Sequence, residues 1–73
     1  MSVDALDAAI AVLRDAGEPL HWTRIQDGAL RAGYLDPFET PEVRKELLAA
    51  LARGVREGML EKISTGVYEL AGR

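Results

Sequence analysis

The sequence predicts a mostly helical α+β domain that carries one small β-sheet. Three stretches have apolar residues at spacings of three and four, which is typical of amphipathic helices. Two C-terminal runs, and a triplet between the first two helical stretches, alternate apolar and polar residues as strands do. The predicted order is α-β-α-α-β-β. With 73 residues, of which 48 % are hydrophobic, we expect residues 1–73 to fold as one domain with a modest core.

The first helix is predicted over residues 4–16. Its apolar stripe comprises Val3, Leu6, Ile10 and Leu13. Ser2 or Asp4 can cap its beginning, because their side-chain oxygens accept free backbone N–H groups. Gly17 is suited to end it, and Pro19 prevents its continuation.

A very short strand and a second helix follow. Leu20 and Trp22 alternate with His21, which predicts a strand over residues 20–22. Thr23 is the expected N-cap of a helix over residues 23–32. The apolar side of this helix comprises Ile25, Ala29 and Leu30.

The third helix is predicted over residues 41–57. Thr40 offers a capping hydroxyl, and Pro41 suits the first helical position. The apolar face comprises Val43, Leu47, Leu48, Leu51 and Val55. Gly54 lies inside the helix and indicates either close packing or fraying, because glycine is unfavourable there.

A hairpin closes the chain, with strands predicted over residues 59–63 and 67–70. Ser64, Thr65 and Gly66 form the expected three-residue turn between them. An isolated two-stranded hairpin is only marginally stable in water. We therefore expect residues 20–22 to pair with one edge of the hairpin as a third strand. This arrangement is the winged-helix form of the helix-turn-helix, with the hairpin as the wing.

Three segments of the chain resemble parts of one known domain family. AIAVLRDAGEPLHWTRIQDGALRAGYL is similar to the first half of the HARE-type helix-turn-helix domain, in which a helix ending in Leu leads to Gly-x-Pro-Leu and a second helix. TPEVRKELLAALARGVREG resembles its third helix, and LEKISTGVYEL resembles its closing wing with a Gly-x-Tyr-x-Leu ending. Members occur in restriction enzymes, in chromatin-associated proteins and at the amino end of the bacterial RNA polymerase delta subunit. The resemblance implies a winged helix that serves DNA recognition or docking to nucleic-acid machinery.

Charge is distributed unevenly along the chain. The net charge of −3 argues against indiscriminate nucleic-acid binding, which requires a basic surface. However, residues 41–73 carry six basic and five acidic residues, whereas residues 1–22 carry one and four. The positive charge therefore lies in the second half of the chain, and mostly on the third helix.

The candidate DNA-binding residues begin with the third helix. Lys45, Ala49, Ala52 and Arg56 fall on one line at helical spacing, with Arg53 beside them. The two alanines let the helix backbone approach a groove closely, and the bases can meet phosphates or base edges. The alternative is an ordinary solvated face with Glu42–Lys45 and Glu46–Arg53 ion pairs.

Two further groups extend this candidate interface. At the start of the second helix, Thr23 and Arg24 are expected to contact the phosphate backbone, as the first helix of a helix-turn-helix motif does. On the wing, Lys62, Ser64 and Thr65 offer an ammonium group and hydroxyls to phosphates. The alternatives are ordinary surface charge for Arg24 and simple turn chemistry for Ser64 and Thr65.

A protein-interaction module is the other function class that the sequence supports. In that case the Tyr34–Phe38 loop or the acidic first helix docks a protein partner or a second copy of the chain. The chain could also be a targeting module within a longer protein. The sequence has one histidine, no cysteine and no Gly-rich phosphate loop. We therefore expect no catalytic activity and no metal or cofactor site. Without a run of about 18 apolar residues, no membrane span is expected, and the predicted location is the cytoplasm or the nucleoid.

Overall fold

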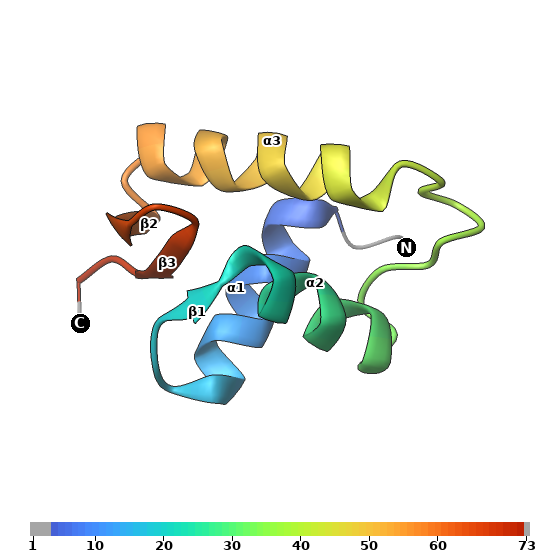
Figure 1. Ribbon diagram of the computed structural model, residues 1–73, viewed down its shortest axis with the longest axis horizontal. Coiled ribbons are helices and arrows are strands. Elements are labelled where there is room, and N and C mark those ends of the chain that lie inside the picture. The colour runs from blue at the N-terminus through green and yellow to red at the C-terminus, as the bar shows by residue number, and fades with distance from the viewer. Residues whose placement is uncertain (1–3, 73) are drawn as a thin grey trace.

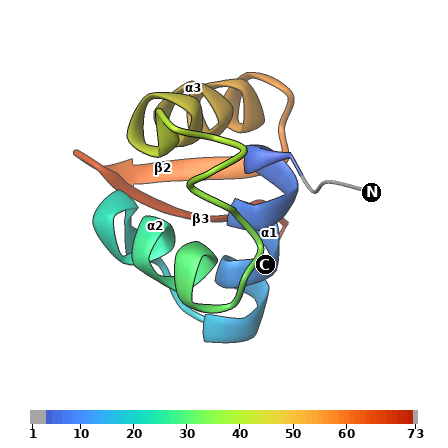
Figure 2. The same ribbon diagram turned by 90° about the vertical axis from the view of Figure 1, so that its right-hand side faces the viewer.

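The computed structural model describes residues 4–72 and has three helices and one three-stranded sheet (Figure 1). The elements are α1 (Ala5–Ala16), β1 (Leu20–His21), α2 (Trp22–Arg31), α3 (Val43–Arg56), β2 (Leu60–Ser64) and β3 (Val67–Leu70). This confirms the predicted α+β class and the order α-β-α-α-β-β. In the view of Figure 1, helix α3 lies above α1 and α2, and the β2–β3 hairpin follows at the C-terminal end of α3. In the view of Figure 2, α3 lies on one side of the hairpin and α2 lies on the other.

Helix α1 begins and ends close to the predicted residues. Asp4 is its N-cap, and the Asp7 backbone N–H donates to Asp4 Oδ1 at 2.8 Å. Gly17 ends the helix, with its N–H donating to the Leu13 carbonyl at 3.0 Å. The alternative cap Ser2 and the stripe residue Val3 lie outside the described residues.

The junction between β1 and α2 differs from the prediction by one residue. Trp22 is the first residue of α2, so the predicted strand over 20–22 and helix over 23–32 were wrong at this boundary. Thr23 is not the N-cap, because the His21 imidazole takes that role. His21 Nδ1 accepts the Thr23 backbone N–H at 3.3 Å and lies 2.8 Å from Thr23 Oγ1.

The start of α3 was also predicted wrongly. The helix spans Val43–Arg56 rather than 41–57, and its N-cap Glu42 makes no side-chain capping hydrogen bond. Thr40 does not cap the helix, because it belongs to the preceding turn, where its N–H donates to the Asp36 carbonyl at 2.8 Å. That turn is held further by the Phe38 N–H, which donates to Asp36 Oδ1 at 2.9 Å.

The sheet has the strand order β1-β3-β2 and is antiparallel throughout. Leu20 of β1 pairs with Tyr68 of β3. This pairing confirms the expected third strand, which gives the hairpin a partner along one edge.

The hairpin differs from its prediction in the bounds of its first strand and in the length of its turn. Strand β2 spans residues 60–64 rather than 59–63, because Ser64 pairs with Val67 across a register shift. The turn therefore contains two residues, Thr65 and Gly66, rather than three.

A single core joins the three helices to the sheet. Its largest fully buried side chains are Leu13, Ile25, Leu47, Leu51 and Leu60. Leu35, in the loop after α2, is also buried, although nothing in its local sequence pattern predicts it. Val55 was expected on the buried face of α3 but is 37 % exposed. No helix in residues 4–72 combines the length and apolar character that a membrane crossing needs.

Candidate nucleic-acid interface

The outer face of α3 is the first part of the candidate interface. Lys45, Ala49, Ala52 and Arg56 are all exposed, and they lie opposite the buried residues Leu47 and Leu51. We call these four exposed residues the α3 ridge. Figure 1 shows that one side of α3 faces away from α1 and α2. The exposed line that the sequence spacing predicts is therefore present, with a basic residue near each end.

Arg53 does not belong to this ridge. Its Nη2 lies 3.7 Å from Asp4 Oδ2, and its Nε lies 4.0 Å from Glu57 Oε2. The contact with Asp4 directs the guanidinium toward the start of α1 and away from the outer face. The expected Glu46–Arg53 pair does not occur among the ion pairs of residues 4–72, whereas the Lys45–Glu42 pair does, at 3.8 Å.

Arg44 lies on the other flank of α3, and the sequence did not single it out. Its guanidinium carbon lies 5.4 Å from the ring centroid of Trp22, which is a cation–π contact. The only sequence signal for Arg44 was its position beside the ridge. Its partner Trp22 lies on another helix, so helical spacing alone could not reveal the contact.

The hairpin turn meets the first turn of α2. The Trp22 backbone N–H donates to the Gly66 carbonyl at 2.8 Å. The exposed residues Thr23 and Thr65 therefore lie on segments that adjoin each other. The structure thus brings together the two groups that were predicted separately, at the start of α2 and at the tip of the hairpin.

The remaining predicted contact residues are accessible. Arg24 follows Thr23 in the first turn of α2 and is exposed. Lys62 and Ser64 on β2 are exposed as well, although β2 begins with the buried Leu60. Basic and hydroxyl side chains are therefore available on α2 and the hairpin in addition to the α3 ridge.

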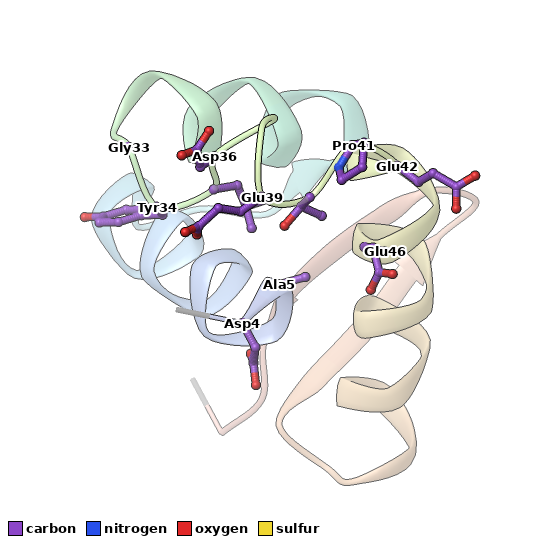
Figure 3. Close-up of a pocket in the computed structure, with 11 residues that line it drawn as sticks. Asp4, Ala5, Gly33, Tyr34, Asp36, Glu39, Pro41, Glu42 and Glu46 are labelled. Carbon is purple, nitrogen blue, oxygen red and sulfur yellow. The ribbon is translucent and has the colours of Figure 1, made fainter. Parts of the chain in front are cut away.

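An acidic groove lies where α1 begins and the α2–α3 loop enters α3 (Figure 3). Its volume is about 930 Å³. It is lined by Asp4, Ala5, Gly33, Tyr34, Leu35, Asp36, Glu39, Thr40, Pro41, Glu42 and Glu46. Five of these side chains are carboxylates and none is basic. No three of the described acidic or histidine side chains are grouped as metal ligands would be.

The two aromatic residues of the α2–α3 loop behave differently. Tyr34 is half-buried, and its hydroxyl donates to Asp15 Oδ2 at 3.0 Å. This hydrogen bond, together with the negative charge of Asp15, raises the pKa of Tyr34. Phe38, in contrast, is 93 % exposed. The loop is therefore anchored through Tyr34 and presents Phe38 to solvent.

Comparison of the chain with protein-family models, with curated proteins and with solved structures found no match. The residues and geometry described above are therefore the basis on which a function can be proposed.

Proposed function

We propose that this chain is a winged-helix DNA-binding module in which α3 is the recognition helix. The main support is the α3 ridge, where two alanines separate Lys45 from Arg56 on the exposed side of the helix. Small side chains between two bases allow the helix to lie deep in the major groove while its cations contact phosphates or base edges. As part of the same proposal, the chain is related to HARE-type domains, and it acts at the nucleoid or in the cytoplasm.

The hairpin acts as the wing in this proposal. Its turn adjoins the start of α2, so Thr65 and Ser64 can contact the same stretch of phosphate backbone as Thr23 and Arg24. The acidic groove supports one orientation of the duplex, because its carboxylates repel phosphate. DNA is expected to avoid that groove and to approach the ridge and the wing.

Binding of a labelled DNA duplex, measured by fluorescence anisotropy at several salt concentrations, tests this proposal. The affinity should fall steeply as salt rises, because each neutralised phosphate releases counterions. Replacing both Lys45 and Arg56 with Ala should weaken binding and reduce the salt slope by about two. The matched control is Arg31→Ala, since Arg31 pairs with Asp27 at 3.2 Å at the end of α2 that lies away from the hairpin turn. Absence of salt-dependent binding at low salt would contradict the proposal.

A protein-docking role is the second candidate, and the acidic groove favours it. A partner with a basic surface would complement the five carboxylates, and Phe38 offers an apolar anchor in the loop that lines the groove. If the partner is a second copy, sedimentation equilibrium should show a concentration-dependent mass. Phe38→Ser should then abolish that association, whereas the Lys45→Ala and Arg56→Ala double variant should associate as wild type does.

A further inference from the structure

Arg44 differs from Arg53, on the other flank of α3, in what surrounds its guanidinium. Arg53 is paired with Asp4 and Glu57. Arg44 has no carboxylate within ion-pairing distance among residues 4–72, and its charged group lies over the Trp22 ring instead. An aromatic face holds a guanidinium without occupying its N–H groups, because the attraction acts perpendicular to the ring plane. The hydrogen-bonding edge of Arg44 therefore remains available.

Trp22 is itself fixed in place by three neighbouring features. Its backbone N–H is bonded to the Gly66 carbonyl at 2.8 Å, and its side chain is half-buried against the core. The His21 ring lies 5.7 Å from the Trp22 ring, centroid to centroid, and His21 is held in turn by Thr23. The indole is thus a packed aromatic platform at the junction of α2, α3 and the hairpin turn.

We infer that Arg44 is a phosphate-contacting residue of the DNA interface and that Trp22 is its positioning residue. This inference rests on the proposed function, because it places the phosphate on the flank of α3 that faces the wing. A guanidinium can donate two parallel hydrogen bonds to phosphate oxygens. Stacking on Trp22 restricts the side chain before binding, so less conformational entropy is lost when the phosphate arrives.

The position of Arg44 agrees with this role. It lies in the first turn of α3, beside the α3 ridge and opposite the flank where Arg53 meets Asp4. The start of α2, with Thr23 and Arg24, adjoins the same junction through Trp22. A single stretch of DNA backbone could therefore contact Arg44, the α2 start and the wing turn while the ridge enters the groove.

A double-mutant cycle on DNA binding tests the inference. The four proteins are wild type, Arg44→Ala, Trp22→Leu and the double variant, titrated with a labelled random-sequence duplex over a series of salt concentrations. Arg44→Ala should weaken binding roughly tenfold at low salt and reduce the salt slope by about one. Trp22→Leu should weaken binding by roughly two- to fivefold while the salt slope stays the same, because the charge remains. In the Arg44→Ala background, Trp22→Leu should have no further effect.

Trp22→Phe separates positioning from a purely structural role. Phenylalanine keeps an aromatic face, so this variant should recover most of the affinity that Trp22→Leu loses. If thermal unfolding followed by circular dichroism shows the leucine variant to be unfolded at the assay temperature, Trp22→Met takes its place in the cycle, because methionine fills the space with a flexible apolar side chain that has no aromatic face. Arg44→Lys, which keeps the charge but not the planar group, should restore the salt slope and only part of the affinity.

The outcomes distinguish this inference from the proposed function. If wild type shows no salt-dependent DNA binding, both are overturned. If wild type binds and the Lys45→Ala and Arg56→Ala double variant is impaired, but Arg44→Ala binds as wild type does, the inference alone is overturned. It is also overturned if Trp22→Leu costs the same affinity with and without Arg44.

Discussion

Arg53 of α3 pairs with Asp4, the residue that caps α1. Arg53 Nη2 lies 3.7 Å from Asp4 Oδ2, while Asp4 Oδ1 accepts the Asp7 backbone N–H at 2.8 Å. One carboxylate therefore satisfies the first turn of α1 and also attaches that turn to the second half of α3. Both side chains are about half exposed, so most of the stabilising effect of Asp4 should come from the cap rather than from the ion pair.

Replacing Asp4 should therefore reveal two unequal contributions to stability. Asp4→Ala removes both interactions and should lower the free energy of unfolding by about 1 to 2 kcal/mol. Asp4→Asn keeps a capping oxygen and should cost less than about 1 kcal/mol. Urea denaturation measures both values. The control is Asp27→Ala, which removes only an exposed ion pair with Arg31 and should cost about 0.5 kcal/mol or less. Equal losses for Asp4→Ala and Asp27→Ala would contradict the capping role.

Gly54 marks a close approach of α3 to its neighbours. A Cβ at this position would lie 2.8 Å from Leu6 Cδ1 and 2.8 Å from Leu60 Cδ1. Alanine ordinarily stabilises a helix interior by about 1 kcal/mol relative to glycine. Here both leucines are buried, and moving them would disturb packed neighbours. We expect Gly54→Ala to lower the free energy of unfolding by about 1 to 2 kcal/mol.

The source of that loss can be checked with a second substitution. In a Leu60→Ala background, part of the clash disappears, so Gly54→Ala should cost less there than in wild type. Chemical denaturation of the four proteins gives the interaction energy. If Gly54→Ala raises the stability of wild type, helix propensity outweighs packing and the contact is looser than the distances indicate.

The sequence pattern predicted the helices well because their periodicity is local, but their ends depend on contacts made by the folded chain. Thr40 and Pro41 have the residue types of a helix start, yet Thr40 closes the turn at Asp36 and the helix begins only at Val43. Thr23 is a better cap by residue type than His21, yet the His21 imidazole accepts the free N–H. Leu35 is buried by tertiary packing in a loop whose sequence shows no period.

In the candidate site, too, the sequence predicts what depends on local helical spacing but not what depends on contacts between helices. The α3 ridge could be predicted, since residues at spacings of four, three and four always share one helix face. Arg53 and Arg44 could not be assigned in the same way, because each flanks the ridge and turns toward a partner outside α3. Only the packing of α1 and α2 against α3 shows that one is paired and the other stacked.

Stability at high pH should depend on the hydrogen bond between Tyr34 and Asp15. Because the folded state raises the pKa of Tyr34, the unfolded chain loses this proton at a lower pH than the folded protein does. The stabilisation is fully present below the ordinary tyrosine pKa of about 10 and is lost as the pH rises through the folded value. The thermal midpoint of wild type should therefore fall above that pH.

Two variants isolate this effect. Tyr34→Phe should remove the part of the alkaline loss that belongs to this residue. Asp15→Asn removes the negative charge, so the pKa of Tyr34 should move down toward its ordinary value in an ultraviolet absorbance titration. An unchanged titration in Asp15→Asn would show that the hydrogen bond with Asp15 does not cause the raised pKa.

Gly66 in the hairpin turn is expected to tolerate substitution poorly for two separate reasons. Its φ of +75° is a conformation that residues with a side chain rarely adopt, and a Cβ there would lie 2.8 Å from His21 Nε2. Gly17 provides a matched control, because its φ is +69° and a Cβ added there would have no neighbouring atom within 4 Å. Gly17→Ala should therefore cost only the conformational strain, about 1 kcal/mol.

Gly66→Ala should cost more than Gly17→Ala, by about 1 kcal/mol or more, because it adds the clash with His21. The excess should shrink in a His21→Ala background, where the imidazole no longer opposes the new Cβ. Differences in the free energy of unfolding from urea denaturation measure each step. If Gly66→Ala and Gly17→Ala cost the same, the hairpin turn is not packed tightly against the start of α2. In that case, only the Trp22–Gly66 hydrogen bond and the pairing of β1 with β3 would connect the hairpin turn to the start of α2.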